Sequence, residues 1–509
     1  MIEAYFSHLI LLLLIFIIPL IVFMKLLNKT GTKSNLPPSP PSFPIIGHLL
    51  MLKQPLHENL QKLSQKFGPV MLLHFGVRKF VVVTSLSVVE ECFNQTNDVV
   101  FSNRPRVSAA KNMTYNFSSI TVAPYGDLWR ALRRVAASEF FSTTHLAATT
   151  HSREHEVKLM CRQIYNESQK SQQVVELESK FRGLMNNIIT MGFIGKRYFG
   201  GDLMIEKGDV EVAHRFQEIM EESFTQINAP KIEEFLPFLK WVGIGRTREM
   251  ESYELMEKTN ELLDEFIRER RRKGCSGSGL MVDSLLALQD AEPELYTHDI
   301  IRSHILAIIL TGTEAPNFAL EWTMSLLLNN RKVMQKLKNE IDTKVDSNRL
   351  LQEGDLDRLS YLQNVIDESL RLYPPVPMLL PREASKDIMI GGYSIPRGTT
   401  LMVNAWAIHR DPVLWDNPDE FIPERFGEKL EDKYKTIPFG VGRRGCPGMN
   451  LGYRVLGLAL GTLIQAFEWE TIGGGEIDMT ASYGDLLMCK LKPLQALCKP
   501  RSNMIAHFL

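Results

Sequence analysis

Apolar residues are unevenly distributed along the chain, and their spacing predicts most of its secondary structure. An almost uninterrupted apolar run from Ala4 to Met24 has the length of about 20 residues that a helix needs to cross a hydrocarbon core. Glu3 precedes this run and three lysines follow it by position 33, which places the remainder on the cytoplasmic side. No signal-peptide cleavage pattern follows. We therefore expect residues 1–30 to form one N-terminal transmembrane helix.

A proline-rich segment separates this run from the rest of the chain. Residues 31–48 contain the sequence from Leu36 to Pro44, in which five of the nine residues are proline. Proline fixes φ and lacks a backbone donor, so dense prolines make a stiff, extended connector. We expect a rigid linker over residues 31–48 and a catalytic domain over residues 49–509.

Beyond the linker, helical periodicity is far more common than alternation. Apolar runs at 70–75 and 80–83, joined through residues 76–79, predict a β-hairpin. The glycine and serine residues at 274–279 predict a surface loop. No fixed-period repeat is present. Helices are expected at 255–273, 299–328, 332–345, 359–372 and 451–467. The pattern predicts one large, mainly α domain with a small β-rich portion.

Composition and charge exclude several classes of protein. The 58 basic and 59 acidic residues give a net charge of −1, which argues against a nucleic-acid binder. The six cysteines are scattered without a CxxC pair, which excludes a zinc ribbon and a disulfide scaffold and favours a reducing compartment. One cysteine can therefore be present for its chemistry.

Cys446 lies in a glycine-rich loop, just before an apolar stretch of helical length. A helix N-terminus presents unpaired N–H groups and a positive dipole end, and we expect these to favour the thiolate of Cys446. Pro447 suits the first position of that helix. A single thiolate cannot build a structural zinc site, but it can supply the one axial protein ligand of a haem iron.

The loop resembles the signature of the cytochrome P450 family of haem-thiolate monooxygenases. The pattern F-x-x-G-x-R-x-C-x-G is matched by Phe439, Gly442, Arg444, Cys446 and Gly448. The resemblance implies the cytochrome P450 fold, haem b with iron bound by Cys446, and electrons from NADPH through a flavoprotein reductase. It also implies cytochrome b5 as a further electron donor, a small apolar substrate, and a monomer in the endoplasmic reticulum membrane with its catalytic domain in the cytoplasm.

Further motifs extend the resemblance along the chain. Glu368 and Arg371 form the ExxR pair and Arg425 lies in the PERF segment, and in the family these three residues fix the scaffold beside the haem. Trp129 and Arg133 resemble the family's WxxxR helix, which binds a haem propionate, and the resemblance makes Arg382 and Arg444 further propionate partners. On the adjacent stripe of that helix we expect two arginines to contact an acidic reductase or to be merely solvated: Arg130 and Arg134.

The helix expected over the haem departs from the family pattern. The family has a small residue, glycine, an acid and threonine here, whereas this chain has Gly312 and Glu314 but Ala315 in place of the threonine. A methyl group forms no hydrogen bond, so proton delivery needs water, the Thr311 hydroxyl or the substrate. Pro316 frees the Gly312 carbonyl to hold a water. Some plant members that close methylenedioxy bridges have a similar loss, which makes that reaction a hypothesis alongside simple drift.

The linker and haem loop are most similar to those of plant microsomal enzymes, in the branch that hydroxylates isoflavonoids or builds lignan bridges. This implies oxidation of an apolar aromatic plant metabolite of the phenylpropanoid, lignan or isoflavonoid class, by hydroxylation or bridge formation. The alternatives are a non-catalytic haem sensor or carrier, and a hydroperoxide-rearranging enzyme. Family alignment places substrate contacts in the regions 107–122, 376–379 and 483–487 and on the central helix, including His304, Ile308, Val376, Leu379 and Leu486.

Overall fold

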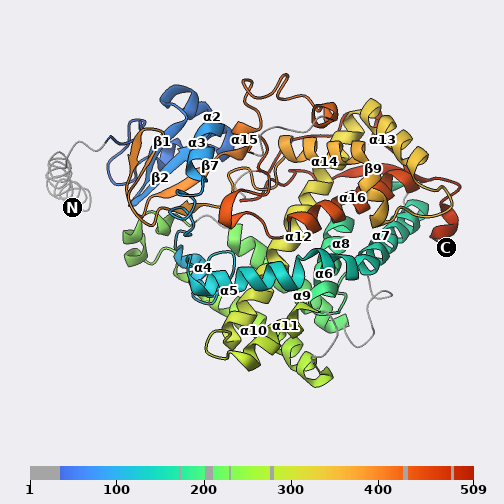
Figure 1. Cartoon of the computed structure of the whole chain (residues 1–509), viewed down its shortest axis with the longest axis horizontal. Coiled ribbons are helices and arrows are strands. Elements are labelled where there is room, and N and C mark those ends of the chain that lie inside the picture. Colours follow the sequence, from blue (N-terminus) through green and yellow to red (C-terminus); the bar gives the residue numbers. More distant parts are fainter. Residues whose placement is uncertain are drawn as a thin grey trace, which may run out of the picture.

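The computed structural model describes residues 35–170, 173–200, 210–228, 231–274, 280–427, 434–482 and 486–508. Helices account for most of these residues (Figure 1). They are α2 (Leu56–Phe67), α3 (Leu86–Cys92), α4 (Ser108–Met113), α5 (Asp127–Val135), α6 (Thr143–Ala148), α7 (Thr150–Lys170), α8 (Glu178–Phe193), α9 (Val210–Asn228), α10 (Arg246–Lys273), α11 (Met281–Ala291), α12 (His298–Asn329), α13 (Arg331–Lys344), α14 (Ser360–Leu372), α15 (Ala405–Ile408) and α16 (Met449–Ala466).

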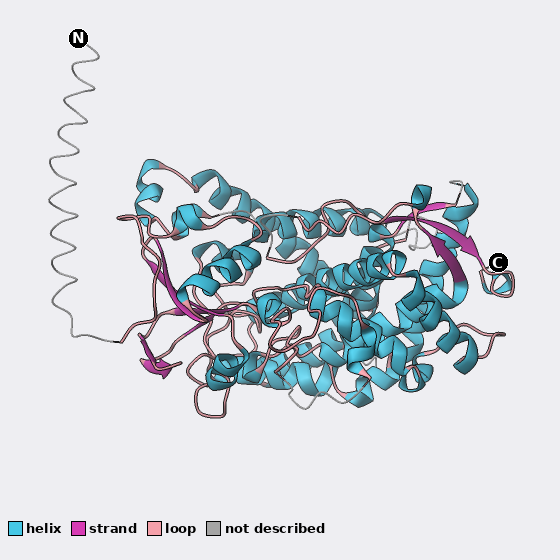
Figure 2. Cartoon of the chain, turned by 90° about the horizontal axis from the view of Figure 1, so that it is seen from above, coloured by secondary structure: helices cyan, strands magenta, loops and turns pink. Residues whose placement is uncertain are grey.

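The strands form two main sheets and a separate hairpin. The four-stranded sheet has the order β1-β2-β7-β4, the three-stranded sheet has the order β3-β9-β8, and β5 pairs with β6. Figure 2 shows the strands at two opposite ends of the molecule, with the helices between them. The strands are β1 (Val70–Phe75), β2 (Arg78–Val83), β3 (Val174–Glu176), β4 (Arg382–Glu383), β5 (Ile388–Ile390), β6 (Tyr393–Ile395), β7 (Thr400–Val403), β8 (Phe467–Glu470) and β9 (Gln495–Pro500).

Two long helices run through the helical core. Both α12 and α16 are buried along most of their length, as expected of helices enclosed by others. Close packing of α16 depends on Gly461, because a Cβ there would lie 2.8 Å from the Leu351 side chain. α12 packs along α8 and passes through the centre of the molecule (Figure 1). The surrounding helices therefore place α12 on one side of an interior space and the N-terminal end of α16 on the other.

The expected elements are largely confirmed. All five expected helices are present, although α10 begins at Arg246, nine residues earlier than expected. The hairpin is also present, but its turn is shorter than expected because β2 begins at Arg78. Gly76 adopts a φ of 54°, which suits a two-residue turn. The fold class is mainly α with a small β portion, as predicted.

The expected N-terminal helix, residues 1–30, lies outside the described residues. Within the described part of the chain, no helix has both the length and the apolarity that crossing a membrane requires. The described part of the linker lies against the sheet, since the Leu72 N–H of β1 donates to the Pro38 carbonyl at 2.9 Å. The predicted loop at 274–279 is described only at Gly274, where α10 ends.

Candidate functional site

A large cavity lies between the loop before α16 and the middle of α12. It has a volume of about 360 Å³, within the usual range for ligand sites. Cys446 lines one side, whereas Thr311, Gly312, Ala315 and Pro316 of α12 line another. The structure thus brings together segments that are 130 residues apart in the sequence. Most of the lining is apolar, and arginines line part of it.

The loop around Cys446 is shaped by close backbone contacts. The Cys446 N–H donates to the Phe439 carbonyl at 2.8 Å, which closes the loop on itself. Gly442 has a φ of 68°, and a Cβ there would fall on the carboxylate of Asp98. Gly448 would bring a Cβ within 3.3 Å of the Phe141 ring. Gly442 is therefore required by backbone conformation and by space, whereas Gly448 fits closely against the Phe141 ring.

The thiol of Cys446 lines the cavity just before α16, but its pKa departs from expectation. Burial raises the pKa of Cys446 above its usual value, and the Gly448 N–H and the charge of Arg133 lower it only in part. The loop N–H and Arg133 therefore act in the predicted direction, but burial raises the pKa of Cys446 by more than they lower it. Desolvation of the charged form outweighs the helix end, and a bound metal ion would have to displace the proton.

Four arginines line the cavity, and burial lowers the pKa of each. Burial, followed by the neighbouring Arg382 and Arg133, lowers the pKa of Arg444 to about 9. Burial also lowers the pKa of Arg382 to about 10, although Asp98 opposes this shift. The pKa values of Arg104 and Arg133 are lowered too, again chiefly by burial. Crowded, desolvated cations of this kind favour an anionic ligand.

Several of these side chains already have backbone partners. Arg444 donates to the carbonyls of Ser102 at 2.7 Å and Ile120 at 3.2 Å, and also to Ala123. The indole N–H of Trp129 donates to Ile120 at 3.1 Å, so its contact with a propionate stays a prediction. Trp129 and Arg133 both line the cavity from α5, one helical turn apart.

The residues Glu368, Arg371 and Arg425 meet as the ExxR and PERF resemblance implies. Arg371 Nε lies 2.7 Å from Glu368 Oε2 and its Nη2 lies 2.8 Å from Oε1, and both side chains are wholly buried. Arg425 Nε reaches the same carboxylate at 3.0 Å. Arg371 also donates to the carbonyl of His409 at 2.6 Å. This network ties α14 to the segment that leads to the Cys446 loop.

On α12 the polar residues divide between two faces. Thr311 lines the cavity, and its hydroxyl donates to the Ala307 carbonyl at 2.7 Å. Glu314 lies outside the cavity lining and points toward α8, where its Oε1 is 3.7 Å from Arg182 Nη1. Burial raises the pKa of Glu314, and nearby Glu178 adds to this while Arg182 opposes it. A Cβ at Gly312 would lie 3.0 Å from Ile189, so its small size also serves helix packing.

Most of the expected substrate-facing residues line the cavity. Ile308, Val376, Leu379 and Leu486 are all in the lining, and so are Ile120 and Thr121 of the expected 107–122 region. Leu379 has a φ of 47°, an unusual backbone for leucine that marks a strained turn at the site. His304 does not line the cavity. Its ring is completely enclosed, because the first turns of α12 lie beyond the cavity.

Sequence reasoning missed several contributors. Arg104 lines the cavity and is held by the carbonyls of Leu380 at 2.6 Å and Pro381 at 2.7 Å. The apolar wall includes Met185 and Ile188 of α8 and Phe224 of α9. An arginine beside a proline carries no specific sequence signal, and helix periodicity cannot tell a cavity wall from the core.

The residues present fit a haem. A flat, mostly apolar macrocycle with two carboxylates suits a largely apolar cavity with a thiol on one face and desolvated arginines within reach. Cys446 is the residue that would ligate the iron, and Arg104, Arg133, Arg382 and Arg444 offer cations to the propionates.

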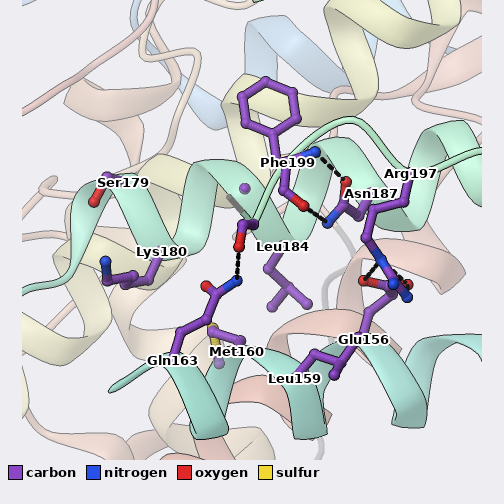
Figure 3. Close-up of a pocket in the computed structure, with 12 residues that line it drawn as sticks. Glu156, Leu159, Met160, Gln163, Ser179, Lys180, Leu184, Asn187, Arg197 and Phe199 are labelled. Carbon is purple, nitrogen blue, oxygen red and sulfur yellow. Dashed lines mark hydrogen bonds and ion pairs between the residues drawn. The ribbon is translucent and has the colours of Figure 1, made fainter. Parts of the chain in front are cut away.

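A second pocket lies between α7 and α8, with a volume of about 340 Å³ (Figure 3). Its polar groups are engaged with one another. Arg197 Nε lies 3.1 Å from Glu156 Oε1, and the amide of Asn187 bonds both N–H and C=O of Phe199. Lys180 is 2.5 Å from Glu167. These paired side chains connect neighbouring segments of the protein, so the pocket is better explained as part of the structure than as a binding site.

Comparison with known proteins agrees with this geometry. The model of the family "Cytochrome P450" matches residues 37–497. Cytochrome P450 81Q32 of Catharanthus roseus is 43% identical over 96% of both chains. The (+)-piperitol/(+)-sesamin synthase of Sesamum radiatum is 42% identical over 95% of both. The isoflavone 2'-hydroxylase of Glycyrrhiza echinata is 40% identical over 96% of both.

Among solved structures, a zebra fish cytochrome P450 with progesterone matches with a TM-score of 0.75 and 23% identity, covering 88% of this chain and all of that one. This likeness shows the fold. The chain belongs to the cytochrome P450 family, whose microsomal members are haem-dependent monooxygenases that receive electrons from NADPH through a flavoprotein reductase and act on small apolar molecules.

Proposed function

We propose that this enzyme oxidises an apolar aromatic plant metabolite of the phenylpropanoid, lignan or isoflavonoid class, by hydroxylation or by closing a methylenedioxy bridge. The observation that carries this proposal is the cavity, in which Cys446 faces an apolar space bounded by Ile308, Val376, Leu379 and Leu486. The likeness to an isoflavone 2'-hydroxylase and to a (+)-piperitol/(+)-sesamin synthase supports the substrate class.

The haem supplies oxygen activation when it is bound, through the electron donation of its thiolate ligand. The chain's own residues hold and orient the reactants. The apolar wall excludes water from the substrate and aligns its flat face by packing. The cavity arginines would hold the haem propionates, and the Glu368 network keeps the Cys446 loop in place.

We infer that protons reach the cavity across α12, from Glu314 on the α8 face to a water at the Gly312 carbonyl on the cavity face. Pro316 has no N–H, so the Gly312 carbonyl lacks its usual helical donor and can hold a water at the cavity wall. Glu314, two residues further along α12 and on the α8 side, has a buried Oε2 without a hydrogen-bond partner among the described residues. We assign Glu314 to receive a proton from the partly exposed side of Arg182 and to pass it to the water that the Gly312 carbonyl holds at the cavity wall.

Ala315 favours bridge formation over hydroxylation. It lines the cavity where the family usually has a hydroxyl, so the protein offers one polar group fewer to the bound oxygen. In bridge closure the methyl carbon of an ortho-methoxyphenol is first hydroxylated; the neighbouring phenol oxygen then attacks that carbon and the new hydroxyl leaves as water, so the substrate itself brings a hydroxyl to the site. The phenol loses its proton as the new carbon–oxygen bond forms.

The test is turnover by the full chain in membranes with the reductase and NADPH. Methoxyphenolic lignans and isoflavonoids are supplied, and products are identified by mass. Hydroxylation adds one oxygen atom to the substrate, whereas bridge closure removes two hydrogen atoms. A reduced, carbon monoxide-treated sample that lacks the thiolate-type absorption band would contradict the proposal at its base. Normal spectra without conversion of either class would contradict the substrate class alone.

We also infer an endoplasmic reticulum location, with residues 1–30 as a single anchor and the catalytic domain in the cytoplasm. The apolar run from Ala4 to Met24 supports it. Phe238, Trp241 and Val242 on the short helix Pro237–Val242 support it too, since Trp241 is 89% exposed and such a patch favours an apolar surface. A monomer that also accepts electrons from cytochrome b5 completes the proposal. Alkaline extraction of membranes should release a chain without residues 1–30 and retain the full chain.

A further inference from the structure

Asp98 is a buried acid that neither the motifs nor the cavity lining identifies. It lies after α3, far in sequence from the Cys446 loop, and it is 6% exposed. Within the described residues it faces the backbone of that loop and two arginines, Arg382 and Arg443. A buried carboxylate is costly unless it is paired and hydrogen-bonded, so this arrangement calls for an explanation.

The carboxylate of Asp98 holds the loop at a specific point. Its Oδ2 accepts the backbone N–H of Arg443 at 2.8 Å, three residues before Cys446. Its other oxygen occupies the place that a Cβ of Gly442 would take. The turn at Gly442 therefore has a partner outside the loop, since the Asp98 carboxylate fills the space that a side chain at position 442 would need.

The same carboxylate orients an arginine of the cavity. Asp98 Oδ1 lies 3.1 Å from Arg382 Nη1, and Arg382 also donates to the Val441 carbonyl. Arg382 and the Cys446 loop are thus fixed to one acid from two directions. Asp98 is also joined to Arg444 through Ser102, whose hydroxyl donates to the Asp98 carbonyl at 2.7 Å and whose own carbonyl accepts Arg444 Nε.

Asp98 also supplies negative charge where the cavity has an excess of positive charge. Arg104, Arg133, Arg382 and Arg444 line the cavity, and Asp98 is the carboxylate that pairs with one of them within the described chain. Its side chain is 8% exposed, so water screens its charge only weakly. Its field therefore extends into the site.

We propose that Asp98 is a positioning residue for the haem site, which fixes the Cys446 loop through Arg443 N–H and Arg382, and whose negative charge shifts the balance between oxidised and reduced iron. The inference rests on the proposed role of Cys446 as the iron ligand. A negative charge near the iron favours the oxidised, more positive state, so neutralising Asp98 should favour the reduced state.

Three variants of the full-length holoenzyme separate the two roles. Asp98→Asn keeps an oxygen that can accept the Arg443 N–H and removes the charge. We expect it to retain the thiolate-type carbon monoxide band and to shift the ferric–ferrous equilibrium constant about fivefold toward ferrous.

Asp98→Ala removes both the hydrogen-bond acceptor and the charge. We expect its thiolate-type band to convert to the inactive form about tenfold faster than that of the wild type. Asp98→Glu keeps the charge but overfills the site, so we expect loop loosening without the shift in the equilibrium constant.

Asp283→Asn is the matched control. Asp283 is 5% exposed and pairs with Arg270 Nε at 3.0 Å between α10 and α11, outside the cavity lining. It should lower thermal stability without changing the band or the equilibrium constant. Asp98 variants that behave like this control in both readouts would overturn the inference. A wild-type enzyme that shows no thiolate-type band would instead overturn the proposed role of Cys446.

Discussion

The two walls of the cavity are held in different ways. On the side of Cys446, charged groups are locked together: Glu368 is bound by Arg371 and Arg425, and Asp98 by the loop backbone and Arg382. On the side of α12, the lining is mostly apolar. Glu314 lies behind that wall, with one carboxylate oxygen that has no hydrogen-bond partner in the described structure.

The difference indicates where the chemistry is fixed and where it can vary. Each residue on the Cys446 side satisfies several partners at once, so a change there leaves a buried charge or donor unpaired. A change among the apolar residues of the opposite wall alters shape and volume at modest cost. One scaffold can therefore keep the same iron site while its relatives act on different molecules.

Replacing Cys446, the proposed iron ligand, should have the largest effect on activity. Cys446→Ser should abolish the thiolate-type carbon monoxide band and lower turnover by more than about 100-fold, because loss of an outer partner of a metal ligand alone costs roughly 10–100-fold. Spectra and product assays of the purified variant measure both. A normal band with undiminished turnover would refute the assignment of Cys446.

Breaking the Glu368 network should affect stability most strongly. Glu368→Ala leaves Arg371 buried and unpaired, which we expect to lower the free energy of unfolding by about 3–5 kcal/mol. Chemical denaturation measures the change. The control is Glu222→Ala, which removes an exposed partner of Lys258 and should cost less than about 1 kcal/mol. Equal losses would mean that burial of the Glu368 network does not make its loss more costly than that of a surface ion pair.

The pH dependence of stability that Glu321 causes measures how strongly α12 is desolvated beyond the cavity. Burial raises the pKa of Glu321 to about 7, although the Leu494 N–H opposes the shift. The folded state holds this proton better than the unfolded state, so the contribution of Glu321 to stability is fully present below pH 4.5 and is lost as pH rises through 7. Glu321→Gln should remove this decline and gain about 2 kcal/mol at pH 8. Unfolding curves at pH 5 and pH 8 should show no gain at the lower pH.

Restoring at position 315 the threonine that the family usually has should have a moderate effect on the coupling of NADPH consumption to product formation. With Ala315→Thr, the amount of product per NADPH consumed should rise about threefold in hydroxylation, because a hydroxyl at the cavity wall adds a proton donor. Bridge closure should gain less, since its substrate carries its own hydroxyl. Peroxide release and product are measured together. If bridge closure rose while coupling stayed constant, the link between Ala315 and proton supply would be wrong.

The surface arginines of α5 should have the smallest effect. Arg130 and Arg134 are exposed beside the cavity-lining face of this helix. Reversing both charges to glutamate should raise the reductase concentration for half-maximal turnover about twofold at low salt, and less at high salt. Arg331→Glu, at the exposed start of α13, serves as the control. Unchanged reductase dependence would leave these arginines as merely solvated.

Much of the Cys446 side could be predicted because its residues follow one another in short motifs. The loop from Phe439 to Gly448 and the Glu368–Arg371 pair depend on local spacing, which the sequence displays directly. The position of Glu314 could not be predicted in the same way. Its neighbour Ala315 faces the cavity while Glu314 faces α8, and only the packing of α8 decides which face is which.

The sequence by itself determined the helical fold class, the haem ligand candidate and the scaffold pair, because each depends on periodicity or on residues close together in the chain. Only the tertiary structure decided that burial raises the pKa of Cys446, that His304 is enclosed and that Asp98 and Arg104 belong to the site. Desolvation and long-range contacts depend on what packs around a residue, and linear spacing carries no record of that.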